Sequence, residues 1–167
     1  MDLLVIRHAI AGDRAEWAKT GRPDQERPIT DEGRERMQET ARALRQLVPT
    51  LDLLATSPLV RAVQTAEVVG EAYDDLTIEE APPLGHGGAL DEVRAWLAAR
   101  TESCIAIVGH EPDLGQLVSW FLLGDPNAGI ALKKGGACLL RFAGPPDPGT
   151  AELRWFLPPK ILRRLSS

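Results

Sequence analysis

The sequence has no apolar run that approaches the roughly 20 residues needed to cross a bilayer as a helix. The run Leu3-Leu4-Val5-Ile6 is cut short by Arg7, and Asp2 stands where a signal peptide would have its basic region. We therefore expect no membrane segment, no signal peptide and a cytoplasmic location.

Cysteine is also scarce. The two cysteines, Cys104 and Cys138, each lie inside an apolar run, and their spacing fits neither a metal site nor a redox motif. We expect two buried, reduced thiols. A single disulfide between them is the alternative that the sequence leaves open.

The chain lacks an excess of positive charge. Its 167 residues carry a formal net charge of −5, which argues against a nucleic-acid partner because no global basic field would attract a phosphate backbone. A small local basic pocket would still select a compact anion. The length fits one domain, and we expect residues 1–167 to form it.

Several common site motifs are missing as well. No GxGxxG follows the first apolar run, and the sequence contains no GxSxG and no HExxH. These absences argue against a dinucleotide site and a serine-hydrolase elbow. A zinc site built on His8, His86 and His110 is a less favoured alternative, because neither cysteine lies near these loops.

Short apolar segments alternate with amphipathic ones along the chain. Thr30 looks like the N-cap of a helix that Pro49 ends, and Ser57-Pro58 looks like the N-cap and first residue of the next helix. The segment 9–29 is polar and reads as a long loop with one helical turn around 15–19. The predicted strands cover 3–6, 51–56, 76–78, 104–108 and 137–142, with a last half-exposed strand around 152–155, and further helices are expected over 90–97, 112–122 and 158–165.

This alternation predicts an α/β fold, a three-layer α/β/α sandwich with a mostly parallel sheet. The last two strands, separated by the turn at 144–149, are expected to form a hairpin-like pair at the sheet edge.

Basic residues follow three of the predicted strands: Arg7-His8, Arg61 one helical turn beyond its strand, and His110. The carboxyl ends of parallel strands are where ligands bind in open α/β sheets. If these strands are neighbours, the side chains form an anion pocket. Histidine can act as a nucleophile toward phosphorus, and arginine donates paired hydrogen bonds to phosphate oxygens. We expect His8 to take a phosphoryl group, and Arg7, Arg61 and a protonated His110 to supply the positive charge without a metal ion.

Five segments in order resemble a known family. They are Arg7-His8-Ala9, the run RPITDEG at 27–33, the run SPLVRAVQTA at 57–66, the run VGHEPDLG at 108–115 and Lys134-Gly135-Gly136-Ala137. Together they resemble the histidine phosphatase superfamily, which includes phosphoglycerate mutases, and within it the SixA group of phosphohistidine phosphatases. The resemblance implies a phosphoglycerate mutase-like fold and no cofactor. It also implies that His8 is the phosphorylated nucleophile, and that Arg7, Arg61 and His110 bind the phosphoryl group.

The proton donor is the point of departure from that family. Its mutases and broad-range phosphatases usually place a glutamate in the loop after the third strand, where this chain offers Glu79, Glu80 and His86 within no recognisable motif, and of these we select Glu80 and His86. Both are candidate donors, and Asp13 and Glu111 remain open. An imidazole leaving group needs less help from an acid than an alkoxide does.

The absence of a clear acid therefore favours a substrate that carries phosphohistidine on a partner protein. A phosphatase of small phosphate esters and a non-catalytic module that binds phosphorylated proteins are the alternatives. A mutase is less favoured, since nothing in the sequence would hold a second anionic group. The sequence predicts neither the oligomeric state nor the identity of the partner.

Overall fold

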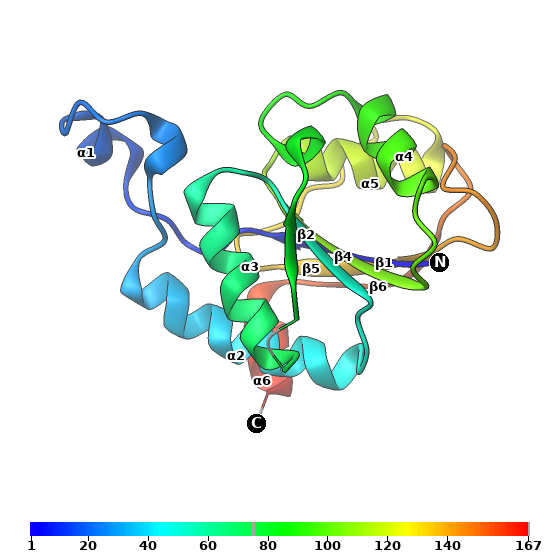
Figure 1. Ribbon diagram of the computed structural model, residues 1–167, viewed down its shortest axis with the longest axis horizontal. Helices are drawn as coiled ribbons and strands as arrows, with labels where there is room; N and C mark the ends of the chain where they lie inside the picture. Colours follow the sequence, from blue (N-terminus) through cyan, green and yellow to red (C-terminus); the bar gives the residue numbers. More distant parts are fainter. Residues whose placement is uncertain (75, 167) are drawn as a thin grey trace.

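One mixed sheet of six strands organises the computed structural model, which describes residues 1–74 and 76–166 (Figure 1). The strand order is β3-β2-β4-β1-β5-β6. Strands β3, β2, β4 and β1 run parallel, whereas β5 is antiparallel to β1 and β6 is antiparallel to β5. The strands are β1 (Asp2–Arg7), β2 (Leu53–Thr56), β3 (Ile78–Glu80), β4 (Cys104–Gly109), β5 (Ala137–Arg141) and β6 (Glu152–Leu157). The predicted parallel sheet with an antiparallel C-terminal edge is confirmed.

Helices cover both faces of this sheet. These helices are α2 (Asp31–Leu47), α3 (Val60–Ala72), α4 (Leu90–Ala98), α5 (Asp113–Leu123) and α6 (Pro159–Leu165). Helix α1 (Arg14–Ala18) buries no residue and lies away from the sheet, and 3-10 turns cover Asp24–Glu26 and Pro82–Leu84. Buried side chains of α2, α3 and α6 share one apolar core, and those of α4 and α5 share the other (Figure 1). The fold is therefore the expected three-layer sandwich.

Strand β1 shows why the short apolar run lies at the centre. Leu4 and Ile6 belong to one core, Leu3 and Val5 to the other, and all four side chains are fully buried. A strand buried on both faces reads as a continuous apolar run rather than an alternating one. The run in the sequence therefore marks the strand that carries Arg7 and His8 to the edge of the sheet.

Two predicted boundaries differ from the structure. Helix α3 begins at Val60 instead of Pro58, because the Oγ of Ser57 is hydrogen-bonded to the His110 ring (2.7 Å) and accepts only the Leu59 amide (3.3 Å) from its own chain segment. The third strand covers 78–80 instead of 76–78. The prolines and glycines of 82–88 predicted a loop from Glu79 onward, but β3 continues to Glu80, and the Glu79 carboxylate is held by Arg100, whose Nη1 lies 3.1 Å away.

Both cysteines are free, as expected, but only Cys138 is fully buried, because Cys104 is partly exposed at the start of β4. Cys138 is buried in β5, and burial raises the pKa of its thiol to about 12. Burial also raises the pKa of Cys104 to about 11, so neither thiol forms a reactive thiolate near neutral pH.

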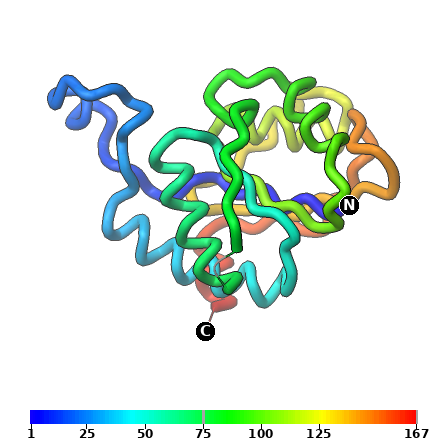
Figure 2. The backbone as a smooth tube through the Cα atoms, in the orientation of Figure 1, coloured from blue at the N-terminus to red at the C-terminus, as the bar shows by residue number. Residues whose placement is uncertain are grey.

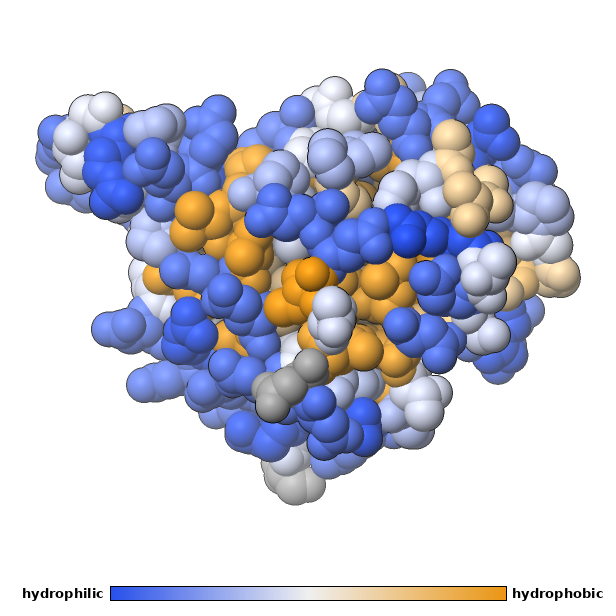
Figure 3. All heavy atoms as spheres, in the orientation of Figure 1, coloured by the Kyte–Doolittle hydropathy of each residue, from blue (hydrophilic) through white to orange (hydrophobic). Residues whose placement is uncertain are grey.

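Residues 10–29, which we call the arm, extend from the body of the protein (Figure 2). A single bridge between Ala11 and Ile29 closes the base of the arm, and the Ile29 amide donates to Oε1 of Gln64 on α3 (2.9 Å). Figure 3 shows the arm as a hydrophilic lobe set off from the body by a hollow. None of the helices in the described part of the chain is both long and apolar enough to cross a membrane.

The first turn of α2 packs closely against Ile10 at the base of the arm, and this contact gives a testable prediction. The Thr30 side chain accepts the Gly33 amide (2.9 Å), and the Thr30 amide donates to the Ile10 carbonyl (2.9 Å). A Cβ at Gly33 would collide with that carbonyl oxygen. We expect Gly33→Ala to lower the free energy of unfolding by about 1–3 kcal/mol, despite the better helix propensity of alanine. Urea unfolding measures this.

Gly144→Ala is the matched control, because nothing lies within 4 Å of a Cβ added there. Equal stability of the Gly33 and Gly144 variants would contradict the close packing of α2 on Ile10.

Candidate active site

The three strand ends predicted to meet do meet. Strands β2, β4 and β1 are neighbours in the sheet. The His8 amide donates to the Gly109 carbonyl (3.0 Å) and the Ser57 amide to the Val108 carbonyl (2.9 Å), so pairing continues past the strand ends. The rings of His8 and His110 lie 5.2 Å apart between centroids, and His86 lies 4.4 Å from His110.

A cavity of about 480 Å³ opens at this edge. Five of its lining side chains are cationic, and only two are acidic. The lining comprises Arg7, His8, Ala11, Gly12, Asp13, Arg14, Arg27, Arg61, His86, Glu111 and Lys134. A cavity with this balance attracts anions even though the whole chain carries net negative charge. We call it the cationic cavity.

His8 is neutral, and its tautomer is set by the backbone. Nδ1 lies 2.7 Å from the Ala9 carbonyl oxygen, which can only accept, so Nδ1 carries the hydrogen. Burial lowers the pKa of His8 to about 3, with a further contribution from the positive charges of Arg61, Arg7 and Lys134. The lone pair is therefore on Nε2, in a side chain that lines the cationic cavity.

Thr65 connects this histidine to helix α3. Its Oγ1 accepts the Ala9 amide (3.0 Å) and donates to the Arg61 carbonyl (2.7 Å). The same Ala9 residue accepts from His8, so the orientation of the His8 ring and the first turn of α3 are coupled through one buried hydroxyl.

Both predicted arginines have donors to spare, although Arg61 is buried and Arg7 is only half-buried. Arg61 is 1% exposed; its Nη1 donates to the Asp24 carbonyl (3.0 Å), and its Nη2 contacts the Asp24 carboxylate (3.2 Å) and Nε2 of His86 (2.9 Å). Arg7 donates from Nη1 to the Leu132 carbonyl (2.7 Å). Within the described residues, the Nε atoms of both arginines are buried without a hydrogen-bond partner. Buried donors of this kind indicate a ligand that accepts hydrogen bonds.

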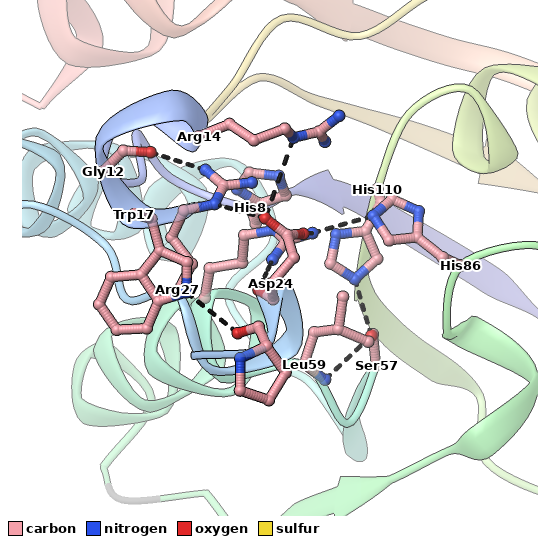
Figure 4. Close-up of polar contacts among 12 residues, drawn as sticks. His8, Gly12, Arg14, Trp17, Asp24, Arg27, Ser57, Leu59, His86 and His110 are labelled. Carbon is pink, nitrogen blue, oxygen red and sulfur yellow. Dashed lines mark hydrogen bonds and ion pairs between the residues drawn. The ribbon is translucent and has the colours of Figure 1, made fainter. Parts of the chain in front are cut away.

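The expectation of a protonated His110 is wrong for the free protein. Burial, together with the neighbouring His8, His86, Arg61 and Arg7, lowers the pKa of His110 to about 2. Its Nε2 lies 2.7 Å from Oγ of Ser57 (Figure 4). Because that oxygen already accepts the Leu59 amide, its own hydrogen can donate to Nε2, which leaves a hydrogen on Nδ1 of His110. His110 therefore contributes a neutral donor, and the positive charge comes from arginine and lysine.

The arm supplies residues that sequence reasoning missed. The Asp24 carboxylate contacts both Arg61 and Nε of Arg27 (2.8 Å) (Figure 4). The hydrogen bond from Arg27 is the main cause that lowers the pKa of Asp24, and the positive charges of Arg61 and Arg27 add to it. Arg27 also donates to the Gly12 carbonyl (2.7 Å). Arg27 and Lys134 both fall in the segments that resemble the family, and that was the available signal for them. Ser57 and Thr65 also fall in such a segment, 57–66, whereas Asp24 lies outside all five segments and carried no signal of this kind.

The candidate proton donors separate in the structure. His86 lines the cationic cavity, with Nδ1 3.5 Å from the Asp113 carboxylate. Glu80 is exposed at the end of β3 and does not line this cavity. Glu111 and Asp13 do line it, but Glu111 accepts the Leu132 amide (3.0 Å) and Asp13 caps α1 through the Glu16 amide (2.9 Å).

The arrangement does not favour the zinc alternative. The three histidine rings lie together, but each directs a nitrogen to a protein partner: Ala9 for His8, Arg61 for His86 and Ser57 for His110. Across residues 1–74 and 76–166, no group of three or more histidine, cysteine, aspartate or glutamate side chains is arranged to hold a metal ion. The adjoining arginines would also repel a cation.

The two buried histidines predict how stability depends on pH. Their pKa values in the folded protein, about 3 for His8 and about 2 for His110, lie below the ordinary value of 6.5. Above pH 6.5 these lowered pKa values do not reduce the free energy of unfolding, because both histidines are neutral in the folded and the unfolded chain. As the pH falls below 6.5, the unfolded chain binds protons that the folded chain does not, so stability decreases progressively toward pH 3. Each histidine contributes up to about 1.4 kcal/mol per pH unit.

Urea unfolding between pH 7 and pH 5 measures this slope, because few carboxylates titrate there. We expect the free energy of unfolding to fall less steeply with decreasing pH in His8→Asn than in the unaltered chain. The difference in slope should be about the contribution of one histidine. Identical slopes would contradict the neutral, buried state of His8.

Comparisons with known proteins agree with this geometry. The profile of the histidine phosphatase superfamily (branch 1) matches residues 3–85. The phosphohistidine phosphatase SixA of Escherichia coli K12 is 30% identical over 129 residues, which cover 75% of this chain and 76% of that protein. An uncharacterized protein of Picosynechococcus sp. PCC 7002 is 36% identical over 144 residues, which cover 84% of this chain and 85% of that protein.

A solved structure shows the same fold. The protein histidine phosphatase SixA complexed with tungstate superposes with a TM-score of 0.78 at 26% identity, covering 97% of this chain and 99% of that one. The chain therefore belongs to the histidine phosphatase superfamily, and it is a phosphatase.

Proposed function

We propose that this phosphatase removes the phosphoryl group from phosphohistidine in a partner protein, through a phosphohistidine intermediate on His8. The observation that carries the proposal is the state of His8: a buried, neutral ring that lines the cationic cavity, with Nδ1–H fixed on the Ala9 carbonyl. This leaves Nε2 as the nucleophile and surrounds it with hydrogen-bond donors.

In the first step, Nε2 of His8 attacks phosphorus, and the bond from phosphorus to the substrate nitrogen breaks. The three phosphoryl oxygens that carry the spread charge are held by Arg7, Arg61 and Nδ1–H of His110. Arg27 and Lys134, which line the same cavity, add positive charge. In the second step, water attacks phosphorus, the bond to Nε2 breaks, and phosphate leaves with His8 restored.

His86 is our proposed proton carrier. Its Nδ1 faces Asp113 (3.5 Å), and its Nε2 accepts from Arg61 (2.9 Å) in the free protein. When Arg61 turns its donors to a phosphoryl group, Nε2 of His86 is free to take a proton from the attacking water in the second step. It can then return a proton to the next leaving group.

Replacing the two candidate donors tests this assignment. We expect His86→Ala to lower kcat by roughly a hundredfold, because general acid–base catalysis by a positioned side chain contributes on the order of 10²–10⁴. Free imidazole added to the buffer should restore part of the rate. Glu80→Gln is the matched control, since Glu80 does not line the cavity. The reverse pattern, with loss in the Glu80 variant alone, would assign the role to Glu80.

The substrate class is tested by comparing kcat/KM for a histidine-phosphorylated protein with values for sugar, nucleotide and serine phosphates. An imidazole leaves more readily than an alkoxide, and the cavity holds no carboxylic acid that is free of other bonds. We expect phosphohistidine to be preferred by at least about a hundredfold. A preference for esters would support the small-molecule alternative, and tight phosphate binding without turnover of any substrate would support a binding module.

A further inference from the structure

A second cavity, of about 430 Å³, lies beside the cationic cavity. Its lining is Arg14, Trp17, Ala18, Asp24 and His86. Arg14 and His86 border both cavities, so the two adjoin each other. We call this second space the arm subsite, because all of its lining residues except His86 belong to the arm.

Trp17 gives the arm subsite its chemical character. The indole Nε1–H donates to the Pro23 carbonyl (3.0 Å, Figure 4), and the Arg22 guanidinium lies 4.7 Å from the ring centroid. Both contacts hold the ring in place before any ligand binds. Because the N–H group is already used, Trp17 presents only carbon surface to a ligand. This surface suits a flat ring that packs against it.

The position of the arm subsite fits the geometry of phosphoryl transfer. Attack is in line, so a phosphoryl group approached by Nε2 of His8 carries its leaving group on the side away from that nitrogen. A substrate larger than phosphate itself must extend out of the cationic cavity. The route bordered by His86 and Arg14 leads into the arm subsite and onto Trp17.

We propose that the arm subsite binds the leaving group of the substrate, and that Trp17 packs against the imidazole ring and adjoining chain of a phosphohistidine residue. The inference rests on the proposed function and adds a specificity-determining residue to it. The cationic cavity holds the phosphoryl group common to all substrates. The arm subsite distinguishes among the groups that carry it.

Two substrates that differ in the leaving group test this. Phosphoramidate releases ammonia and has nothing to place on Trp17, whereas a histidine-phosphorylated peptide fills the arm subsite. We expect Trp17→Ala to lower the ratio of kcat/KM for the peptide to kcat/KM for phosphoramidate by about tenfold, mainly through KM for the peptide. Trp17→Phe keeps a flat apolar ring and should restore most of the ratio.

Trp96→Ala is the matched control. Trp96 is a partly buried tryptophan on α4 with an arginine over its ring (4.3 Å from Arg100), and it lines neither the cationic cavity nor the arm subsite. Its substitution should leave the ratio unaltered. The phosphoramidate rate reports folding of each variant. A ratio unchanged in Trp17→Ala, or lowered equally in Trp17→Phe, would overturn the arm subsite while leaving the proposed function intact. An unaltered enzyme that hydrolyses phosphoramidate but not the phosphopeptide would overturn both.

Discussion

Replacing His8 by alanine is expected to abolish turnover of every substrate, with kcat reduced on the order of a thousandfold or more. Nε2 of His8 forms the bond to phosphorus, and no other neutral ring in the site combines a bonded Nδ1–H with a lone pair facing the cationic cavity. His110 is tied to Ser57 and His86 to Arg61. Neither can take over attack without breaking these bonds. Steady-state hydrolysis of phosphoramidate measures the loss.

Binding of an oxyanion is the control for this variant. The arginines and Lys134 remain in place, so His8→Ala should still bind inorganic phosphate, as followed by titration calorimetry. Its thermal unfolding should also stay cooperative. Activity above about one per cent, in a variant that binds phosphate normally, would mean that His8 is not the nucleophile.

Arg61→Lys is the second change with a large expected effect, a loss in kcat/KM on the order of a hundredfold. The substitution keeps the charge but removes the planar fork, and a lysine presents a single compact ammonium. Arg61 currently holds Asp24 and His86 while keeping a buried Nε–H free. One ammonium group cannot satisfy these partners and a phosphoryl group at once.

The matched control is Arg45→Lys. The Arg45 guanidinium pairs with Asp74 at the surface (3.0 Å), and neither residue lines the cationic cavity. This control should keep full activity. Both variants need a urea unfolding curve, because Asp24 loses a partner when Arg61 is shortened. Unchanged kcat/KM in a folded Arg61→Lys protein would show that the buried guanidinium does not contact the phosphoryl group.

The sheet was predictable because its central strands are apolar on both faces. The runs Leu3–Ile6 and 104–108 are apolar throughout, which is typical of strands buried on both faces of a parallel sheet. The carboxyl ends of parallel strands lie at the same edge of the sheet. The convergence of His8, His110 and Arg61 therefore followed from the sequence pattern. The start of α3 did not, because Ser57 bonds with His110, a residue 53 positions away that no local rule includes.

The arm and the charge states depended on tertiary contacts. Residues 10–29 have no periodic pattern, and their fold is set by Asp24 on Arg61 and by Ile29 on Gln64. The neutral state of His110 follows from its burial among other basic groups, which packing alone determines. Sequence alone also could not choose between Glu80 and His86 as proton donor, because they are only six residues apart. In the structure His86, just before the turn at Gly87 (φ 70°), lines the cationic cavity, and Glu80 does not.

The central claim is that a covalent phosphohistidine forms on His8. Rapid acid-free quenching of the enzyme with a ³²P-labelled substrate, followed by peptide mapping, tests it most directly. The account predicts close to one label per chain at most, stable in alkali and lost in acid, located on the peptide containing His8, and absent from His8→Ala. Label that survives in His8→Ala, or that maps to His86 or His110 in the unaltered enzyme, would contradict it.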